Sequence, residues 1–252
     1  MLSEESVILE ASDLVQGYRN RIVLDQVNLR FTPGVTAILG RNGAGKTTLL
    51  KTLSTEMLPK QGELRINGTR IRGSSALREA RRSIGYLPQG FVADPTFSVA
   101  DLVRYAAWLR EAPTDIGTIE AALEFVDLTE LSSRKIRSLS GGMKQRAAIA
   151  ATIVGSPKLL IFDEPTVGLD PEQRIYFRRL LDSLRDLTII LSTHLIEDVV
   201  TVGDRIVVLS DGRVCFQGSV NELAALSILT DDASTMEHAE SGFLSVIERV
   251  QE

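Results

Sequence analysis

Short apolar runs that alternate with polar residues occupy positions 7–71 and predict β-strands. The runs are VILEASDLV, VNLRF, VTAILG and GELRINGTRI. Alternation with a period of two is typical of strands that bury one face. The Asn67-Gly68 pair in the last run favours a two-residue turn, so the pattern predicts a hairpin there.

A helical spacing of apolar residues replaces this alternation from Thr47 to Leu58, and again in residues 98–110 and 116–128. RSIGYLP predicts a strand ahead of the last two helices, and no strand is predicted between them. Two successive helices inside a chain of strands favour a helical insertion into a domain built on a sheet.

Two continuous apolar runs, KLLIFDEP and LTIILSTH, predict strands that are buried on both faces. The helix expected before the first run carries Ala147, Ala151 and Val154 on one face. Gly155 followed by Pro157 marks the end of that helix. Apolar strands that alternate with helices are typical of an α/β domain.

The segment after KLLIFDEP predicts another helix. Asp170-Pro171 is a typical helix start, and Tyr176, Leu180 and Leu184 share one face of the helix that follows. We therefore expect this helix to pack on the buried strands.

The end of the chain predicts a hairpin and a last helix. Asp211-Gly212 favours a turn in the middle of RIVVLSDGRVCFQG. An acidic linker, TDDAST, then leads to a modestly amphipathic helix whose apolar side holds Phe243, Val246 and Val250.

Composition narrows the class of protein. The chain has 252 residues, of which 44% are hydrophobic and 24% charged, as in soluble globular proteins. A net charge of −5 argues against nucleic acid as the main partner.

The uncharged stretches of the chain, such as Ala147–Pro157, are shorter than the ~20 residues of a membrane-spanning helix. The N-terminus lacks the form of a secretory signal, and Cys215 is the only cysteine. We therefore expect the chain in the cytosol unless a partner holds it elsewhere.

GRNGAGKT, residues 40–47, matches a phosphate-binding loop between a predicted strand and a predicted helix. Glycines let successive backbone N–H groups point at phosphate oxygens, and the helix N-terminus adds its positive dipole end. Lys46 is expected to neutralise the β- and γ-phosphates of ATP, and the Thr47 hydroxyl to ligate Mg²⁺. The alternative, a glycine turn before an ordinary helix, is disfavoured by this context. The residues expected to contact the nucleotide here are Asn42, Gly43, Ala44, Gly45, Lys46, Thr47 and Thr48.

Two adjacent carboxylates end the run KLLIFDEP. Asp163 is expected to hold Mg²⁺ through a water, and Glu164 to polarise an attacking water as general base. Alone, Asp-Glu-Pro after a strand is more often a helix cap or a turn. Together with the phosphate-binding loop, the pair predicts the catalytic edge of an ATPase.

With these motifs in place, the chain resembles the ATP-binding subunit of ABC transporters over roughly residues 6–225. LSGGMKQR, residues 139–146, is the stretch that separates this family from other P-loop ATPases. The resemblance implies an α/β P-loop NTPase core with an antiparallel β subdomain and a helical subdomain inserted at about residues 92–155. Residues 1–225 would form the ABC ATP-binding domain, and residues 226–252 a C-terminal linker and helix.

The resemblance also implies roles for residues outside the phosphate-binding loop. Tyr18 resembles the aromatic that stacks on adenine, and Gln89 the glutamine that reaches Mg²⁺ and the attacking water. His194 resembles the histidine that contacts the γ-phosphate, and Asp170 the acidic residue of a loop that contacts a second subunit. Each also has a simpler explanation: a half-buried aromatic, a solvated glutamine, a core histidine and a helix cap, respectively.

In this family two subunits pack head to tail, with each nucleotide between the phosphate-binding loop of one and the LSGG stretch of the other. Ser140, Gly141 and Gly142 would thus bind the γ-phosphate of ATP held by the opposing subunit, although Ser140 also suits a helix cap. Many relatives carry Gln at the position of Met143. The methionine of this chain lacks the polar contact that such a Gln would make near the partner's nucleotide.

The resemblance implies that ATP hydrolysis drives transport through a separate transmembrane permease, with the chain at the cytoplasmic face of the membrane. The short spacing from Gln89 to Ser140 is similar to exporters of drugs, antibiotics and peptides. A cytosolic ABC ATPase, acting in iron–sulfur cluster assembly or cell division, stays open as an alternative. A pure binding module is disfavoured because Glu164 is present.

Overall fold

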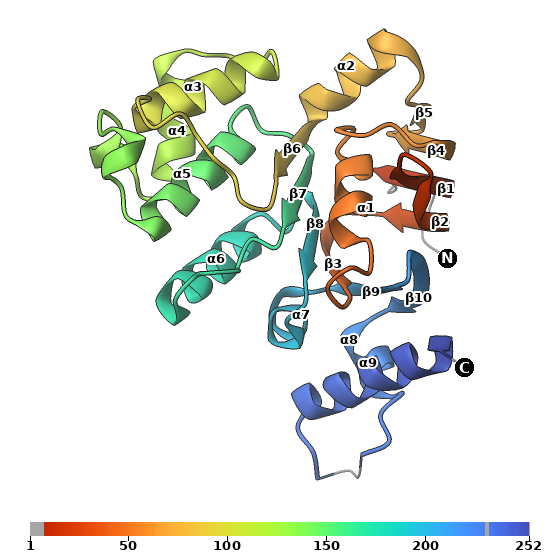
Figure 1. The fold of residues 1–252 in the computed structure, drawn as a ribbon. Helices are drawn as coiled ribbons and strands as arrows, with labels where there is room; N and C mark the ends of the chain where they lie inside the picture. Colours follow the sequence, from red (N-terminus) through yellow and green to blue (C-terminus); the bar gives the residue numbers. More distant parts are fainter. Residues whose placement is uncertain (1–7, 230–231, 252) are drawn as a thin grey trace.

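Two β-sheets with helices packed on them make up the computed structural model, which describes residues 8–229 and 232–251 (Figure 1). The strands are β1 Leu9–Tyr18, β2 Arg21–Phe31, β3 Gly34–Leu39, β4 Gln61–Ile66, β5 Thr69–Arg70, β6 Ile84–Leu87, β7 Leu159–Asp163, β8 Thr188–Thr193, β9 Arg205–Ser210 and β10 Arg213–Gly218. The α-helices are α1 Lys46–Leu53, α2 Gly73–Ser83, α3 Val99–Leu109, α4 Ile116–Glu124, α5 Gly141–Ile153, α6 Pro171–Ser183, α7 Ile196–Val202, α8 Val220–Ala224 and α9 Thr235–Gln251.

The smaller sheet is antiparallel and has the strand order β2-β1-β4-β5. The larger sheet has the order β10-β9-β3-β8-β7-β6 and is parallel except for β10, which pairs antiparallel with β9. Both predicted hairpins are confirmed. Asn67 and Gly68 join β4 to β5, and Asp211 and Gly212 join β9 to β10, all four with the positive φ that such turns need.

The central sheet is buried on both faces, as the runs in β7 and β8 predicted. Along β7, Leu159 and Ile161 belong to the core shared with α1 and the antiparallel sheet. Leu160 and Phe162, which point the other way, belong to the core shared with helices α3 to α9. Alternate residues of one strand therefore hold the two layers of the molecule together.

Two helices differ from the sequence-based expectation. The first ends at Leu53 rather than Leu58, because the chain turns at Thr55, whose φ is 64°. Helix α2 was not predicted: apart from Gly73 its apolar residues are only Ala76, Leu77 and Ala80, and only Ala80 is buried.

Helix α6 begins after Asp170 as expected, and Leu180 of the predicted face is buried, while Tyr176 and Leu184 pack half-buried against the same core. Phe177, rather than Tyr176, lies at the centre of the buried side, together with Leu180 and Leu181. The ring of Phe177 packs edge-on against Phe162 of β7, with 5.6 Å between ring centroids. Because adjacent helical positions differ by 100°, this contact turns Tyr176 to the half-buried edge.

Helices α3, α4 and α5 pack on one another, at the opposite side of the molecule from the antiparallel sheet (Figure 1). No strand lies between α3 and α4, as expected. Ser98, Asp115 and Ser140 cap these three helices by accepting a hydrogen bond from the backbone N–H three residues on.

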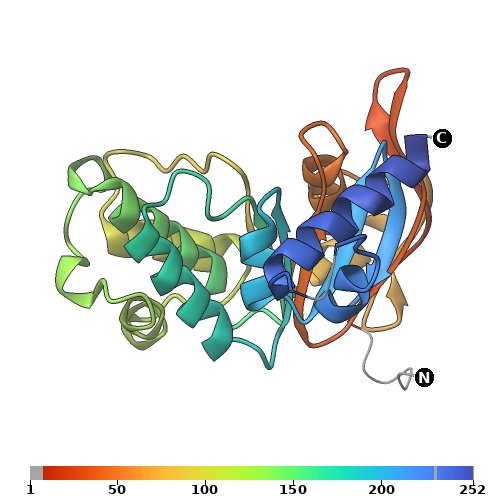
Figure 2. The same ribbon diagram turned by 90° about the horizontal axis from the view of Figure 1, so that it is seen from below.

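The C-terminal helix α9 packs on α8 and runs across β9 and β10 (Figure 2). Val246 is buried and Phe243 half-buried on its inner side, as predicted, while the side chain of Val250 lies outside the described residues. The linker TDDAST lies partly outside them as well. Among the residues that the structure describes, no helix has the length and apolar character to cross a bilayer.

Candidate functional site

The phosphate-binding loop connects β3 to α1, so that its last glycine stands at the N-terminus of the helix. Gly45 has a φ of 104°, and a Cβ there would lie 3.0 Å from Leu24. A Cβ on Gly40 would lie 2.5 Å from the carbonyl oxygen of Leu209. Both positions therefore require glycine, for conformation in one case and for space in the other.

Lys46 is the most enclosed charge of the loop, with only 5% of its side chain exposed. Its ammonium donates a hydrogen bond to the carbonyl of Gly40 at 2.7 Å. The same nitrogen lies 3.4 Å from Oε1 of Glu164. A lysine held in this way presents its positive charge at the mouth of the loop rather than to bulk solvent.

Two further side chains converge on Glu164, whose side chain is 10% exposed. Nε2 of Gln89 and Nδ1 of His194 each lie 3.4 Å from Oε2 of the glutamate. Gln89 follows β6, Glu164 follows β7 and His194 follows β8, which are neighbours in the sheet. The carboxyl ends of parallel strands meet at one edge, so three segments distant in the chain form one site.

Asp163 lies beneath this edge and is almost completely buried. Its Oδ1 accepts a hydrogen bond from the Ser192 hydroxyl at 2.6 Å. Its Oδ2 has no hydrogen-bond partner among the described residues. Burial raises the pKa of Asp163, while the hydroxyls of Ser192 and Thr47 oppose that rise. A free carboxylate oxygen beside a hydroxyl is a donor set that fits a hard cation such as Mg²⁺.

A cleft connects the loop to the edge of the sheet. Of the predicted residues, Ala44 does not line it, because its side chain is buried inside the loop, and Asp163 lies below it. Arg21, Val23 and Val167 line it without having been predicted, since no motif marks them. The lining residues are Tyr18, Arg21, Val23, Asn42, Gly43, Gly45, Lys46, Thr47, Thr48, Gln89, Glu164, Val167 and His194.

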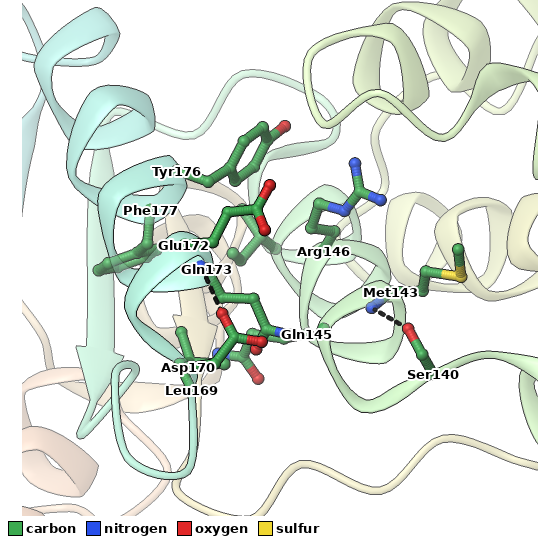
Figure 3. Close-up of a pocket in the computed structure, with 12 residues that line it drawn as sticks. Ser140, Met143, Gln145, Arg146, Leu169, Asp170, Glu172, Gln173, Tyr176 and Phe177 are labelled. Carbon is green, nitrogen blue, oxygen red and sulfur yellow. Dashed lines mark hydrogen bonds between the residues drawn. The ribbon is translucent and has the colours of Figure 1, made fainter.

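A second cavity lies between α5 and α6 (Figure 3). Ser140 caps α5, with its Oγ accepting from the N–H of Met143 at 3.3 Å. Asp170 caps α6, with its Oδ1 accepting from the N–H of Gln173 at 2.9 Å. The side chain of Gln173 reaches across to α5, where a Cβ on Gly142 would meet its amide at 2.5 Å. Two helix N-termini are thus held side by side at one cavity.

The two cavities share no lining residue. The structure brings Lys46, Gln89, Glu164 and His194 together, but it leaves Ser140 and Asp170 at the second cavity. Gly141 instead lines a neighbouring hollow that also includes Phe91 and Val92. Within one chain the predicted nucleotide contacts therefore fall into two separate sets.

Several buried polar residues that support the site were missed by sequence reasoning. Asp198 of α7 accepts hydrogen bonds from Thr166 at 2.6 Å and from Arg178 at 3.0 Å. Gln145 of α5 donates to the carbonyl of Pro165 at 3.0 Å. These bonds hold the turn after Glu164 against α5, α6 and α7. An acidic residue or a glutamine inside a helical stretch carries no sign of such a contact before the tertiary structure is known.

The comparisons with known proteins agree with one another. The ABC transporter family matches residues 24–167. The Nod factor export ATP-binding protein I of Burkholderia thailandensis is 36% identical over 219 residues, which cover 85% of this chain and 71% of that protein.

Two solved structures resemble the whole arrangement. The cbiO1 protein of Clostridium perfringens, part of the ABC transporter complex cbiONQ, is 33% identical with a TM-score of 0.76, over 88% of this chain and 92% of that one. A bacterial ABC transporter cassette solved as a dimer is 26% identical with a TM-score of 0.75, over 84% of this chain and 98% of that one.

Proposed function

The chain belongs to the ABC transporter family as an ATP-binding subunit that hydrolyses ATP, and from this premise we propose that two copies close head to tail on ATP to drive a separate membrane subunit in export. One observation carries the dimer: the catalytic cleft and the Ser140 cavity are separate in a single chain. Each cavity presents a helix N-terminus, and each suits a different side of the same triphosphate.

In the closed pair, the cleft of one subunit holds the phosphates and the Ser140 cavity of the other covers the γ-phosphate. Ser140, the glycines after it and the positive end of α5 supply the donors. Gly141 has open space around the position of a Cβ, so its backbone stays accessible to an oxyanion. ADP lacks the γ-phosphate, and we therefore expect ATP to close the pair and hydrolysis to loosen it.

Hydrolysis is assigned to the residues that converge on Glu164. The carboxylate of Glu164 polarises the attacking water, and Gln89 and His194 orient that water and the γ-phosphate. Lys46 neutralises charge that develops on the phosphates. Thr47, Gln89 and Asp163 would hold Mg²⁺, which supplies further neutralisation of the β- and γ-phosphates.

The membrane subunit is proposed to dock on another hollow, which is lined by the segment after Gln89 and differs from the hollow that Gly141 lines. The hollow lies between β6 and α3 and is lined by apolar and aromatic residues, with Tyr86, Phe97 and Tyr105 among them. At its rim the side chain of Val92 is 87% exposed. An apolar patch of this kind is typical of an interaction site. Export is favoured by the name of the Burkholderia relative.

Glu164→Gln tests the proposed dimer. Without the general base, the variant should bind Mg-ATP and stay closed, so that it elutes from gel filtration as a dimer. With Mg-ADP it should elute as a monomer. Glu120→Gln, which removes an exposed carboxylate of α4, is the matched control and should behave as the wild-type protein. A Glu164→Gln variant that binds ATP but remains monomeric contradicts the head-to-tail arrangement.

A further inference from the structure

Ser192 is a buried serine at the end of β8, directly beside the two carboxylates of the site. It is fully buried, and the register of the parallel pair β7 and β8 places it opposite Asp163. A buried hydroxyl needs hydrogen-bond partners, and its single proton and its lone pairs can serve two different groups. In this structure they serve Asp163 and Glu164, which are adjacent in the chain.

The donated hydrogen bond fixes the carboxylate of Asp163. The Ser192 hydroxyl donates to Oδ1 at 2.6 Å, which is a short distance typical of a hydroxyl on a charged oxygen. Oδ2, the other oxygen, makes no hydrogen bond within the described residues. The serine therefore decides which of the two carboxylate oxygens is left without a hydrogen bond.

The accepted hydrogen bond holds the backbone of Glu164. Its N–H donates to Ser192 Oγ at 2.9 Å. Glu164 has a φ of 49°, a left-handed conformation that residues with a Cβ adopt rarely and that clusters at functional sites. This bend turns the glutamate toward Lys46, Gln89 and His194. The hydroxyl is the group that compensates the strained backbone.

Building on the proposed function, we propose that Ser192 is a positioning residue for ATP hydrolysis, which sets the carboxylate of Asp163 and the backbone of Glu164 with one hydroxyl. Because it is fully buried, it acts only through the two acidic residues. The role differs from ordinary strand packing, because Thr188 lies on the same strand and the same face and is equally buried. The hydroxyl of Thr188 has no hydrogen-bond partner in the described part of the chain, and Thr188 lies four residues before Ser192.

The experiment compares Ser192→Ala, Ser192→Thr and the control Thr188→Val in ATPase kinetics. Ser192→Ala should lower kcat about 10²-fold and change KM for ATP less than about 3-fold, because misplaced catalytic groups affect turnover more than binding. Ser192→Thr keeps the hydroxyl and should recover most of the lost kcat. Thr188→Val should match the wild-type protein. Ser192→Cys, which weakens both hydrogen bonds at similar volume, is measured alongside in case the alanine variant does not fold, and it too should lose turnover.

A second measurement is independent of turnover. Calorimetric binding of ADP, with Mg²⁺ and with EDTA, gives the increase in affinity that the cation causes. Ser192→Ala should reduce that increase about 10-fold, as is usual when a residue that orients a metal ligand is lost, and leave affinity in EDTA unchanged. Wild-type values for Ser192→Ala in both assays overturn the proposal, as does an equal loss in Thr188→Val. Absence of ATPase activity in the wild-type protein would instead refute the proposed function, while the Mg²⁺ measurement still decides the role of Ser192.

Discussion

At the scale of single residues, two lysines of the same helix have different surroundings and therefore different roles. Lys46 and Lys51 both lie on α1, five residues apart. Lys46 is enclosed and contacts Gly40 and Glu164. Lys51 lies at the surface and pairs with Glu56 at 3.0 Å, an interaction that raises the pKa of the lysine. Only the first can neutralise a bound phosphate.

Lys46→Ala should therefore lower kcat at least about 10²-fold, because a charge aimed at the transition state is removed from a site shielded from water. Lys51→Ala removes the same charge from the same helix. It should leave kcat unchanged, since exposed ion pairs contribute only about 0 to 1 kcal/mol to stability. Steady-state ATP hydrolysis measures both. Equal activity of the Lys46→Ala variant and the wild-type protein would exclude the proposed role of Lys46.

At the scale of elements, α5 is held at both ends by different means. Its N-terminus is capped by Ser140 and faces the second cavity. Its C-terminal end lies under Arg110, which follows α3 and donates to the carbonyls of Ala151, Thr152 and Val154 at 2.7 to 2.8 Å. Burial lowers the pKa of Arg110 to about 10, still far above neutral pH. The charged arginine thus fixes the helix that carries the LSGG stretch.

Arg110→Met should lower the free energy of unfolding by about 2 to 4 kcal/mol. The substitution keeps the apolar stem but leaves three helix-end carbonyls without their charged donor. Arg104→Met on α3 removes an exposed arginine that, among the described residues, pairs only with Asp101, and it should change stability by less than about 0.5 kcal/mol. Urea denaturation measures both values. A loss for Arg110→Met no larger than that for Arg104→Met would count against this capping role.

At the scale of the whole molecule, one chain holds two separate cavities, each of which would supply half of the proposed nucleotide site. The Lys46 cleft and the Ser140 cavity have no lining residue in common. The second cavity is lined by residues at α5 and α6 (Figure 3). A symmetric pair in which each subunit offers one cavity to the other would form two complete sites. ATP hydrolysis should then require an intact cleft in one subunit and an intact Ser140 cavity in the other, and need not require both in the same chain.

Mixing two inactive variants tests this dependence. Lys46→Ala damages the cleft and Ser140→Arg damages the second cavity, so each homodimer has no intact site. A mixed dimer pairs the intact cleft of one variant with the intact cavity of the other. An equimolar mixture should therefore recover up to about a quarter of the wild-type ATPase rate. If both half-sites acted within one chain, the mixture would be as inactive as its components. ATP hydrolysis of the separate and mixed proteins distinguishes the two arrangements.

Much of the fold followed from local patterns. Both hairpin turns, the buried strands β7 and β8 and the helix starts at Ser140 and Asp170 were predicted, because turn and cap residues act on their immediate neighbours. Helix α2 was missed: it carries few apolar residues and buries only Ala80. On α6 the predicted Leu180 is buried, but Phe177 rather than Tyr176 is the fully buried aromatic, since only packing against β7 selects between the two adjacent aromatics.

The sequence by itself determined the chemistry available to this protein: a glycine loop before Lys46, paired carboxylates after an apolar strand, and glycines after Ser140. Only the tertiary structure decided that Gln89, Glu164 and His194 meet, that Ser192 holds the carboxylate of Asp163 and the backbone of Glu164, and that Ser140 lies at another cavity. The physical reason is that residue spacing governs contacts within a turn or an element, whereas strand order and register bring distant segments together. Strand order arises from packing of the whole chain and cannot be deduced from the pattern of apolar and polar residues in any one strand.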